Sequence, residues 1–160
     1  MELRDPANLV SSRARTYWAT QYGVLGVILL AAATAGSSVG RLTGEWRWLA
    51  FLAVALVLVV GVGVIPIWRY RVHRWEVTST AIYTKRGWIV QELRIAPLSR
   101  VQTVDTERGP IAQLFKLSTV TVTTASAKGE MKIEGLDRET ADRVVQELTA
   151  ATATGADDAT

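Results

Sequence analysis

Two long runs without a charged side chain constrain this chain more than any other feature. The first covers residues 16–40 and the second covers residues 48–68. A helix of about 20 apolar residues crosses the ~30 Å hydrocarbon core of a bilayer, and both runs are long enough. Aromatic side chains gather near their ends, as is typical of membrane interfaces: Tyr17, Trp18, Tyr22, Trp46, Trp48, Trp68 and Tyr70. The sequence therefore predicts two transmembrane helices.

The short connection between the runs predicts a hairpin. Only residues 41–47 separate the two helices, so the chain enters and leaves the membrane on the same side. A cleaved signal peptide does not fit, because the first run is too long and a second span follows directly. Arginines near the outer ends outnumber those in the loop by five to two: Arg13, Arg15, Arg69, Arg71 and Arg74 against Arg41 and Arg47. The excess predicts that both outer ends are cytoplasmic.

The organisation follows from these boundaries. We expect a cytoplasmic N-terminal segment at 1–15, an extracytoplasmic loop at 41–47, a cytoplasmic domain at 69–151 and a disordered tail at 152–160. The predicted location is the plasma membrane of a bacterium, in a multi-pass arrangement. The spans carry no Asp, Glu, Lys, Arg or His, so the sequence predicts an anchor and not a channel or a proton relay.

Small residues recur at a spacing of four near the end of the first span. Ala32, Gly36 and Gly40 share one helix face. Such a face allows two membrane helices to approach closely. Small residues are also common in membrane spans in general, and the pattern alone leaves both interpretations open. Pro66 is expected to kink the second span or to help it leave the membrane.

From Arg71 onward the pattern changes from continuously apolar to alternating, with turn residues every six to ten positions. This pattern predicts an antiparallel β domain. The expected strands are 71–77, 81–86, 88–95, 101–106, 118–124 and 130–134. A final helix should begin after Asp137, with Glu139 in its first turn. Its apolar stripe consists of Ala141, Val144, Val145 and Leu148. The fold class is thus α+β: a membrane hairpin followed by a curved sheet or partly open barrel that a helix covers.

Two surfaces of this domain are candidate contact sites. Ile111, Leu114 and Phe115 lie at i, i+3 and i+4 and predict a helical turn with one apolar side. That side either plugs one end of the barrel or faces the membrane or a partner. A basic cluster is expected near the anionic leaflet: Arg69, Arg71, Arg74, Lys85 and Arg86. These cations either recognise lipid or only set the topology.

The residues indicate no catalytic chemistry. Cys is absent, and His73 is the single histidine, expected to be solvated at the membrane edge. Gly61 and Gly63 lie within a span and cannot form a phosphate loop. We therefore expect no catalytic residue, no metal or cofactor site and no small-molecule substrate. The net charge of +3 fits membrane topology, so no nucleic-acid partner is expected.

Several segments resemble one family. Ile95-Ala-Pro-Leu-Ser-Arg-Val-Gln-Thr-Val-Asp105, Gly109-Pro110, Leu114-Phe-Lys-Leu117 and a strand ending in Thr124-Ala125 are similar to the signature block of YdbS-like bacterial PH (pleckstrin-homology-like) domain membrane proteins. The resemblance continues through Ile133-Glu-Gly-Leu-Asp and the final helix. The chain departs from the pattern at Ala96, at Ser126, and at Lys116, where glycine is usual.

The resemblance implies a PH-like antiparallel β-barrel capped by a C-terminal helix, with no assigned catalytic residue. One PH-like scaffold serves several kinds of ligand, so the fold does not identify the ligand. We expect a membrane-anchored interaction module, a subunit or scaffold in a protein assembly, with the bilayer and a protein partner or a second copy as its contacts. The first alternative is a sensor of anionic lipid, and an enzyme or an accessory subunit of a transporter ranks after it.

Overall fold

The computed structural model describes residues 4–87, 89–125 and 129–157. These residues form two compact units: one is made of residues 15–68, and the other is made of the described residues before and after that range. Each unit is described separately. The predicted strand start at Trp88, the departure at Ser126 and the last three residues of the predicted tail lie outside the described residues.

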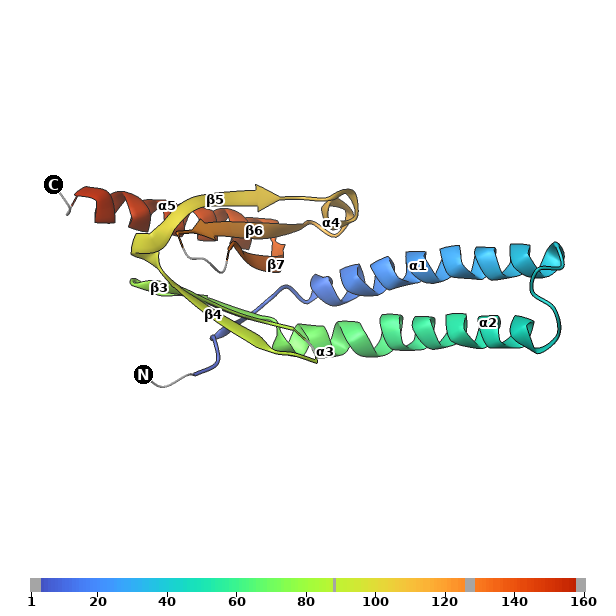
Figure 1. Cartoon of the computed structure of the whole chain (residues 1–160). Helices are drawn as coiled ribbons and strands as arrows, with labels where there is room; N and C mark the ends of the chain where they lie inside the picture. The colour runs from blue at the N-terminus through green and yellow to red at the C-terminus, as the bar shows by residue number, and fades with distance from the viewer. Residues whose placement is uncertain (1–3, 88, 126–128, 158–160) are drawn as a thin grey trace. The chain divides into compact units, whose positions relative to one another are not determined.

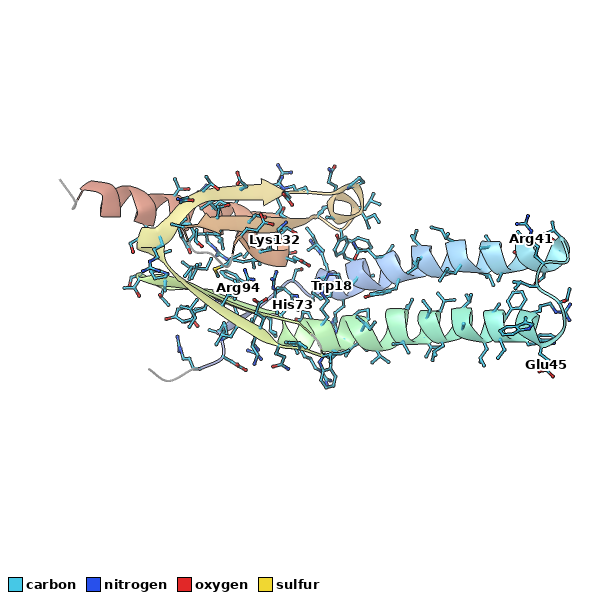
Figure 2. All side chains as sticks on the ribbon, viewed as in Figure 1. Trp18, Arg41, Glu45, His73, Arg94 and Lys132 are labelled. Atoms are coloured by element: carbon cyan, nitrogen blue, oxygen red, sulfur yellow. The ribbon has the colours of Figure 1, made fainter. Side chains whose placement is uncertain are left out.

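The first unit is the helical hairpin. Helix α1 spans Arg13–Ser38, and a second continuous helix is built from α2 (Gly44–Leu58), the π-helical segment η1 (Val59–Val64) and α3 (Ile65–Val72). Both helices are long and apolar enough to cross a membrane. They run antiparallel, with Arg41 and Glu45 at the turn between them (Figures 1 and 2). The π-helical segment ends two residues before Pro66, whose missing N–H and bulky ring disturb the regular α-helical pattern.

Glycines bring the two helices of the hairpin together. A Cβ atom added at Gly61 would lie 2.8 Å from Tyr22 Cδ1, and one added at Gly26 would meet the side chain of Leu58. Gly36, by contrast, faces Leu42 in the connecting turn, and Gly40 has a φ of +74°. The close approach therefore occurs at Gly26 and Gly61, outside the predicted stripe of small residues.

The second unit contains two antiparallel sheets (Figure 1). The first has the order β1-β2-β3-β4, from strands Asn8–Leu9, Arg74–Val77, Ala81–Arg86 and Glu92–Pro97. The second has the order β5-β6-β7, from Val101–Glu107, Leu117–Thr124 and Met131–Asp137. The β-barrel that the family resemblance implies is not closed in the structure, because the 3₁₀ turn η2 (Leu98–Arg100) leads the chain from β4 into the other sheet and β4 and β5 do not pair.

Most predicted strands are present with shifted ends. The strand at 81–86 matches β3, whereas β2 begins three residues later than predicted because α3 continues to Val72. Strand β4 begins at Glu92, and β7 continues to Asp137, three residues past the predicted end. Alternation locates a strand well and its ends poorly, since an end depends on where the pairing stops.

Helix α5 (Arg138–Asp157) packs against β5, β6 and β7. The predicted stripe is confirmed at Ala141, Val144 and Leu148, each of which has no exposed surface. Strand β6 is buried at six of its eight positions, as expected of a central strand that is covered on both faces. The helix continues past residue 152, where the tail was predicted to begin, because alanine-rich sequence favours helix.

The N-terminal segment forms part of this unit, which the sequence did not predict. Asn8 pairs with Trp75 in β2, and the Ser11 N–H donates a 2.9 Å hydrogen bond to the Gly135 carbonyl. Ion pairs connect the same segment to the first sheet: Arg4 with Glu76, and Lys85 with Asp5 at 2.6 Å. The chain is therefore held by the domain both before the hairpin begins and after it ends.

Candidate functional site

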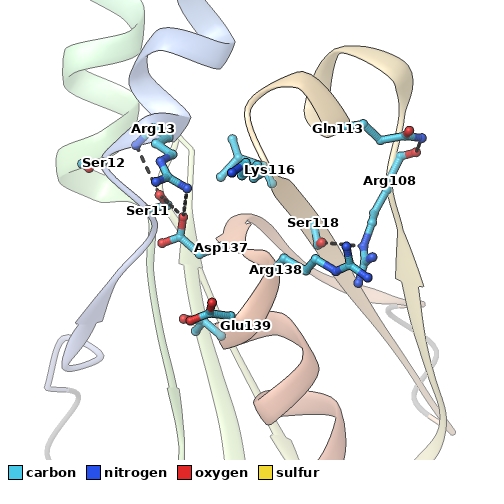
Figure 3. A pocket seen from close by; sticks show the side chains of 12 residues that line it. Ser11, Ser12, Arg13, Arg108, Gln113, Lys116, Ser118, Asp137, Arg138 and Glu139 are labelled. Atoms are coloured by element: carbon cyan, nitrogen blue, oxygen red, sulfur yellow. Dashed lines mark hydrogen bonds and ion pairs between the residues drawn. The ribbon is translucent and has the colours of Figure 1, made fainter.

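A polar cleft of about 930 Å³ lies where the N-terminal segment, the turn before β6 and the start of α5 meet (Figure 3). Its charged lining consists of four cations and two carboxylates: Arg13, Arg108, Lys116, Arg138, Asp137 and Glu139. Hydroxyl groups provide further polar surface in the cleft, from Ser11, Ser12, Ser118 and Thr140. The cleft combines residues from three distant parts of the sequence.

Lys116 reaches the cleft through an unusual backbone conformation. Its φ is +56°, and no other described non-glycine residue has a positive φ. Its N–H donates to the Gln113 carbonyl at 3.1 Å, and its carbonyl accepts from the Arg138 N–H at 3.2 Å. The left-handed region costs an L-residue roughly 1–2 kcal/mol, which explains why glycine is usual after a short helix such as α4 (Pro110–Leu114).

The arginines that line the cleft are paired with carboxylates. Arg108 Nη2 donates to Asp142 Oδ1 at 2.9 Å and its Nε donates to Ser118 Oγ at 2.8 Å. Arg138 Nε lies 4.0 Å from the other oxygen of Asp142. Arg13 lies 3.5 Å from Asp137, which also accepts a 2.9 Å hydrogen bond from Ser11 Oγ. Three carboxylates, counting Asp142, thus face four cations, and the site keeps an excess of positive charge.

The predicted helical turn is confirmed as α4, with Gly109 before it and Pro110 in its first turn. Its apolar side chains do not share one environment. Ala112 is buried, Ile111 and Phe115 are half-buried, and Leu114 is 81% exposed. A partner-facing role for Ile111, Leu114 and Phe115 stays a prediction.

Four cations of the predicted basic cluster have partners within the domain. Arg69 pairs with Glu134, Lys85 with Asp5, and Arg86 with Glu92 at 3.0 Å. Arg74 Nη1 donates a long 3.5 Å hydrogen bond to the Pro6 carbonyl, and Arg71 is exposed. The hydrogen bond from Lys85 holds the pKa of Asp5 below its usual value. Because these contacts already use much of the positive charge, lipid recognition by the cluster has to compete with them.

His73 is buried and not solvated, so that prediction is wrong. The residue is 7% exposed, and its Nδ1 donates to the Arg69 carbonyl at 2.9 Å. Burial lowers the pKa of His73 to about 4, and the positive charge of Arg69 acts in the same direction. The residue follows directly on α3 and precedes β2, so it is enclosed where the chain enters the sheet.

Strand β5 presents an open edge. In the part of the chain that the structure describes, it pairs with β6 on one side and has no strand on the other. Five of its seven residues are exposed. Asp105 and Glu107 lie two positions apart on it, and Asp105 accepts a 3.3 Å hydrogen bond from Thr103 Oγ1. The pattern of the strand was predicted, whereas its position at the edge depends on the sheet order.

Comparison with known proteins extends over most of the chain. The model of the bacterial PH domain family matches residues 19–152. The UPF0699 transmembrane protein YdbS of Bacillus subtilis (strain 168) is 30% identical over 143 residues, which cover 88% of this chain and 89% of that protein. Solved structures provide no significant match. On these similarities and on its fold, the chain belongs to the bacterial PH domain family.

Proposed function

We propose that this protein is a membrane-anchored interaction module that acts as a subunit or scaffold in a protein assembly of the bacterial plasma membrane and performs no catalysis. The two apolar helices would serve as the anchor. A tether of this kind raises the effective concentration of a domain for partners in the same membrane. The PH-like domain would supply the binding surface on the cytoplasmic side.

The open edge of β5 is the observation that carries this proposal. An extended segment of a partner can add to such an edge through main-chain hydrogen bonds, and its side chains then provide specificity. The strand has seven residues, most of them exposed, and one unoccupied side among the described strands. An exposed edge of this length is a template for pairing unless charges protect it.

The charges of β5 favour one kind of partner. Asp105 and Glu107 are both exposed on the strand. Two copies of β5 would bring carboxylates of like charge together, which disfavours indiscriminate self-pairing. A partner strand with lysine or arginine opposite these positions would gain favourable cross-strand pairs. We therefore expect a basic, extended segment of another protein to bind this edge.

Site-specific photocrosslinking in native membranes tests the proposal. A photoreactive amino acid at Thr106 on β5 should give a discrete protein adduct, and the same group at Gln146 on the exposed face of α5 should not. The double variant Asp105→Lys/Glu107→Lys should abolish the adduct, whereas Glu147→Lys, on α5, should retain it. Capture of lipid alone, or of the same proteins from both positions, would contradict the proposal. An adduct of twice the chain mass would identify a second copy as the partner.

The cytoplasmic placement has its own test, because the chain lacks cysteine. Single cysteines at Thr43, before α2, and at Glu147, on α5, allow labelling of one position at a time. A membrane-impermeant maleimide added to intact cells should label Thr43→Cys and leave Glu147→Cys unmodified until the cells are opened. The reverse pattern would place the domain outside the cytoplasm.

A further inference from the structure

The polar cleft at the start of α5 lies on a different part of the domain from the open edge of β5. Its lining side chains come from the N-terminal segment, from α4 and its flanking residues between Arg108 and Ser118, and from the first residues of α5. Nothing in the proposed interaction through β5 uses these residues. Their chemistry therefore has to be considered independently.

The positive charge of this cleft is only partly neutralised. Arg108 and Arg138 share Asp142, and Arg13 is paired with Asp137. No ion pair to the Lys116 ammonium occurs among those between described residues, and this side chain lines the cleft directly (Figure 3). An ammonium group with three donor hydrogens readily binds an oxyanion.

Neutral donors stand beside these cations. Ser118 is buried with 1% exposure and lines the cleft wall. Its oxygen accepts the hydrogen bond from Arg108 Nε, so its own O–H can still donate to an acceptor. The arrangement of cations with a buried hydroxyl provides both the charge and the directional donors that a phosphate group requires.

The backbone places Lys116 in this position against its intrinsic preference. Glycine adopts a φ near +56° without strain, whereas lysine does not. Two hydrogen bonds hold this conformation, one to Gln113 and one from Arg138. A cation is thus kept at the cleft at a position where an uncharged glycine would be the less strained residue.

We propose that this cleft binds a phosphate-type anion, with Lys116 and Arg138 as its ionic contacts and Ser118 as a hydrogen-bond donor. Glu139 lines the same cleft and opposes an anion. The proposal therefore predicts that removing the charge of Lys116 weakens binding of the anion, whereas removing the charge of Glu139 strengthens it. The phosphate can belong to a lipid headgroup or to a soluble phosphorylated molecule, and the two sources are separable by experiment.

The test uses the full chain in nanodiscs, with thermal stabilisation as the measure of binding. One series contains phosphatidylcholine and is titrated with inorganic phosphate; the other contains increasing fractions of phosphatidylglycerol. Lys116→Gln and Lys116→Gly should weaken saturable stabilisation by roughly tenfold in apparent affinity, as expected for the loss of one charge-assisted contact. Lys116→Arg should retain it, and Glu139→Gln should strengthen it. Arg143→Gln removes a cation from the exposed face of α5 and should have no effect.

Each outcome decides the proposal. A response to phosphate that depends on Lys116 assigns a soluble ligand, and one seen only with phosphatidylglycerol assigns a headgroup. Lys116→Gly keeps the test valid if Lys116→Gln folds poorly, because glycine relieves the backbone strain. No saturable response in either series, an equal loss with Arg143→Gln, or weaker binding with Glu139→Gln would overturn the proposal. None of these results depends on the crosslinking at β5.

Discussion

Gly61→Ala tests a close contact between the two helices of the hairpin. The added Cβ would lie 2.8 Å from Tyr22 Cδ1 and 2.9 Å from Tyr22 Cβ and Cγ. Carbon atoms in good contact are about 3.5–4.0 Å apart, so the new methyl group is too close by about 0.7 Å or more. Tyr22 Cβ is bonded to the backbone of α1, and a simple rotation of the ring does not remove the overlap.

The expected cost is that of overpacking, roughly 1–3 kcal/mol. Gly63→Ala is a matched control, because Gly63 lies in the same π-helical segment and a Cβ there has no neighbour within 4 Å. Both substitutions change the intrinsic helix preference equally, so their difference reports the steric contact. For a chain of this length, 1 kcal/mol corresponds to a change in Tm of about 2–4 °C.

The measurement is thermal unfolding of the full chain in detergent micelles, followed by far-UV circular dichroism. Gly61→Ala should lower the Tm by about 4–8 °C if the cost is about 2 kcal/mol, and Gly63→Ala should not lower it. Tyr22→Gly removes all three overlapping atoms of Tyr22, so in that background glycine and alanine at position 61 should differ little in Tm. Equal effects of Gly61→Ala and Gly63→Ala, or no rescue by Tyr22→Gly, would refute the reasoning.

Three further predictions concern the domain. The pKa of His73 is about 4 in the fold against 6.5 for the free side chain, so the unfolded state binds more protons between these pH values. The free energy of unfolding should therefore decrease as the pH falls from about 6.5 to about 4, and His73→Gln should flatten this part of the profile in urea titrations at several pH values. Leu148→Ala, at a fully buried position, should lower the free energy of unfolding in urea by about 2–5 kcal/mol. Glu147→Ala, on the exposed face of the same helix, should change that free energy by less than about 0.5 kcal/mol. Similar losses for the two variants would contradict the packing of α5. Asp137→Ala removes the acceptor for Ser11 and Arg13, so amide hydrogen exchange should accelerate in residues 8–13 and stay unchanged in β6; uniform acceleration would instead indicate global destabilisation.

Local pattern was sufficient for the elements whose stability depends on near neighbours. The two uncharged runs predict both helices of the hairpin, because about 20 apolar residues meet the requirement of a bilayer wherever they occur. The i, i+3, i+4 and i+7 spacing located the buried face of α5, and the alternation located the strands from β2 to β7. The predicted helical turn at Ile111 follows from the same kind of local spacing.

The short strand β1 shows where such patterns fail. Asn8 and Leu9 are too few to form a periodic signal, and they become a strand only because β2 pairs with them. The partner of Lys85 is Asp5, 80 positions away along the chain. Burial of His73 likewise depends on its surroundings in the fold and not on its neighbours in sequence.

The sequence by itself determined the apolar helical hairpin, the order of the main elements that follow it and the family, because these follow from composition, period and motifs along the chain. Only the tertiary structure decided that the sheets do not close, that β5 lies at an edge, and that residues near positions 12, 116 and 138 line one cleft. The physical reason is that sheet closure and cleft formation depend on contacts between distant segments. The pattern of residues along the chain does not show which distant segments are in contact.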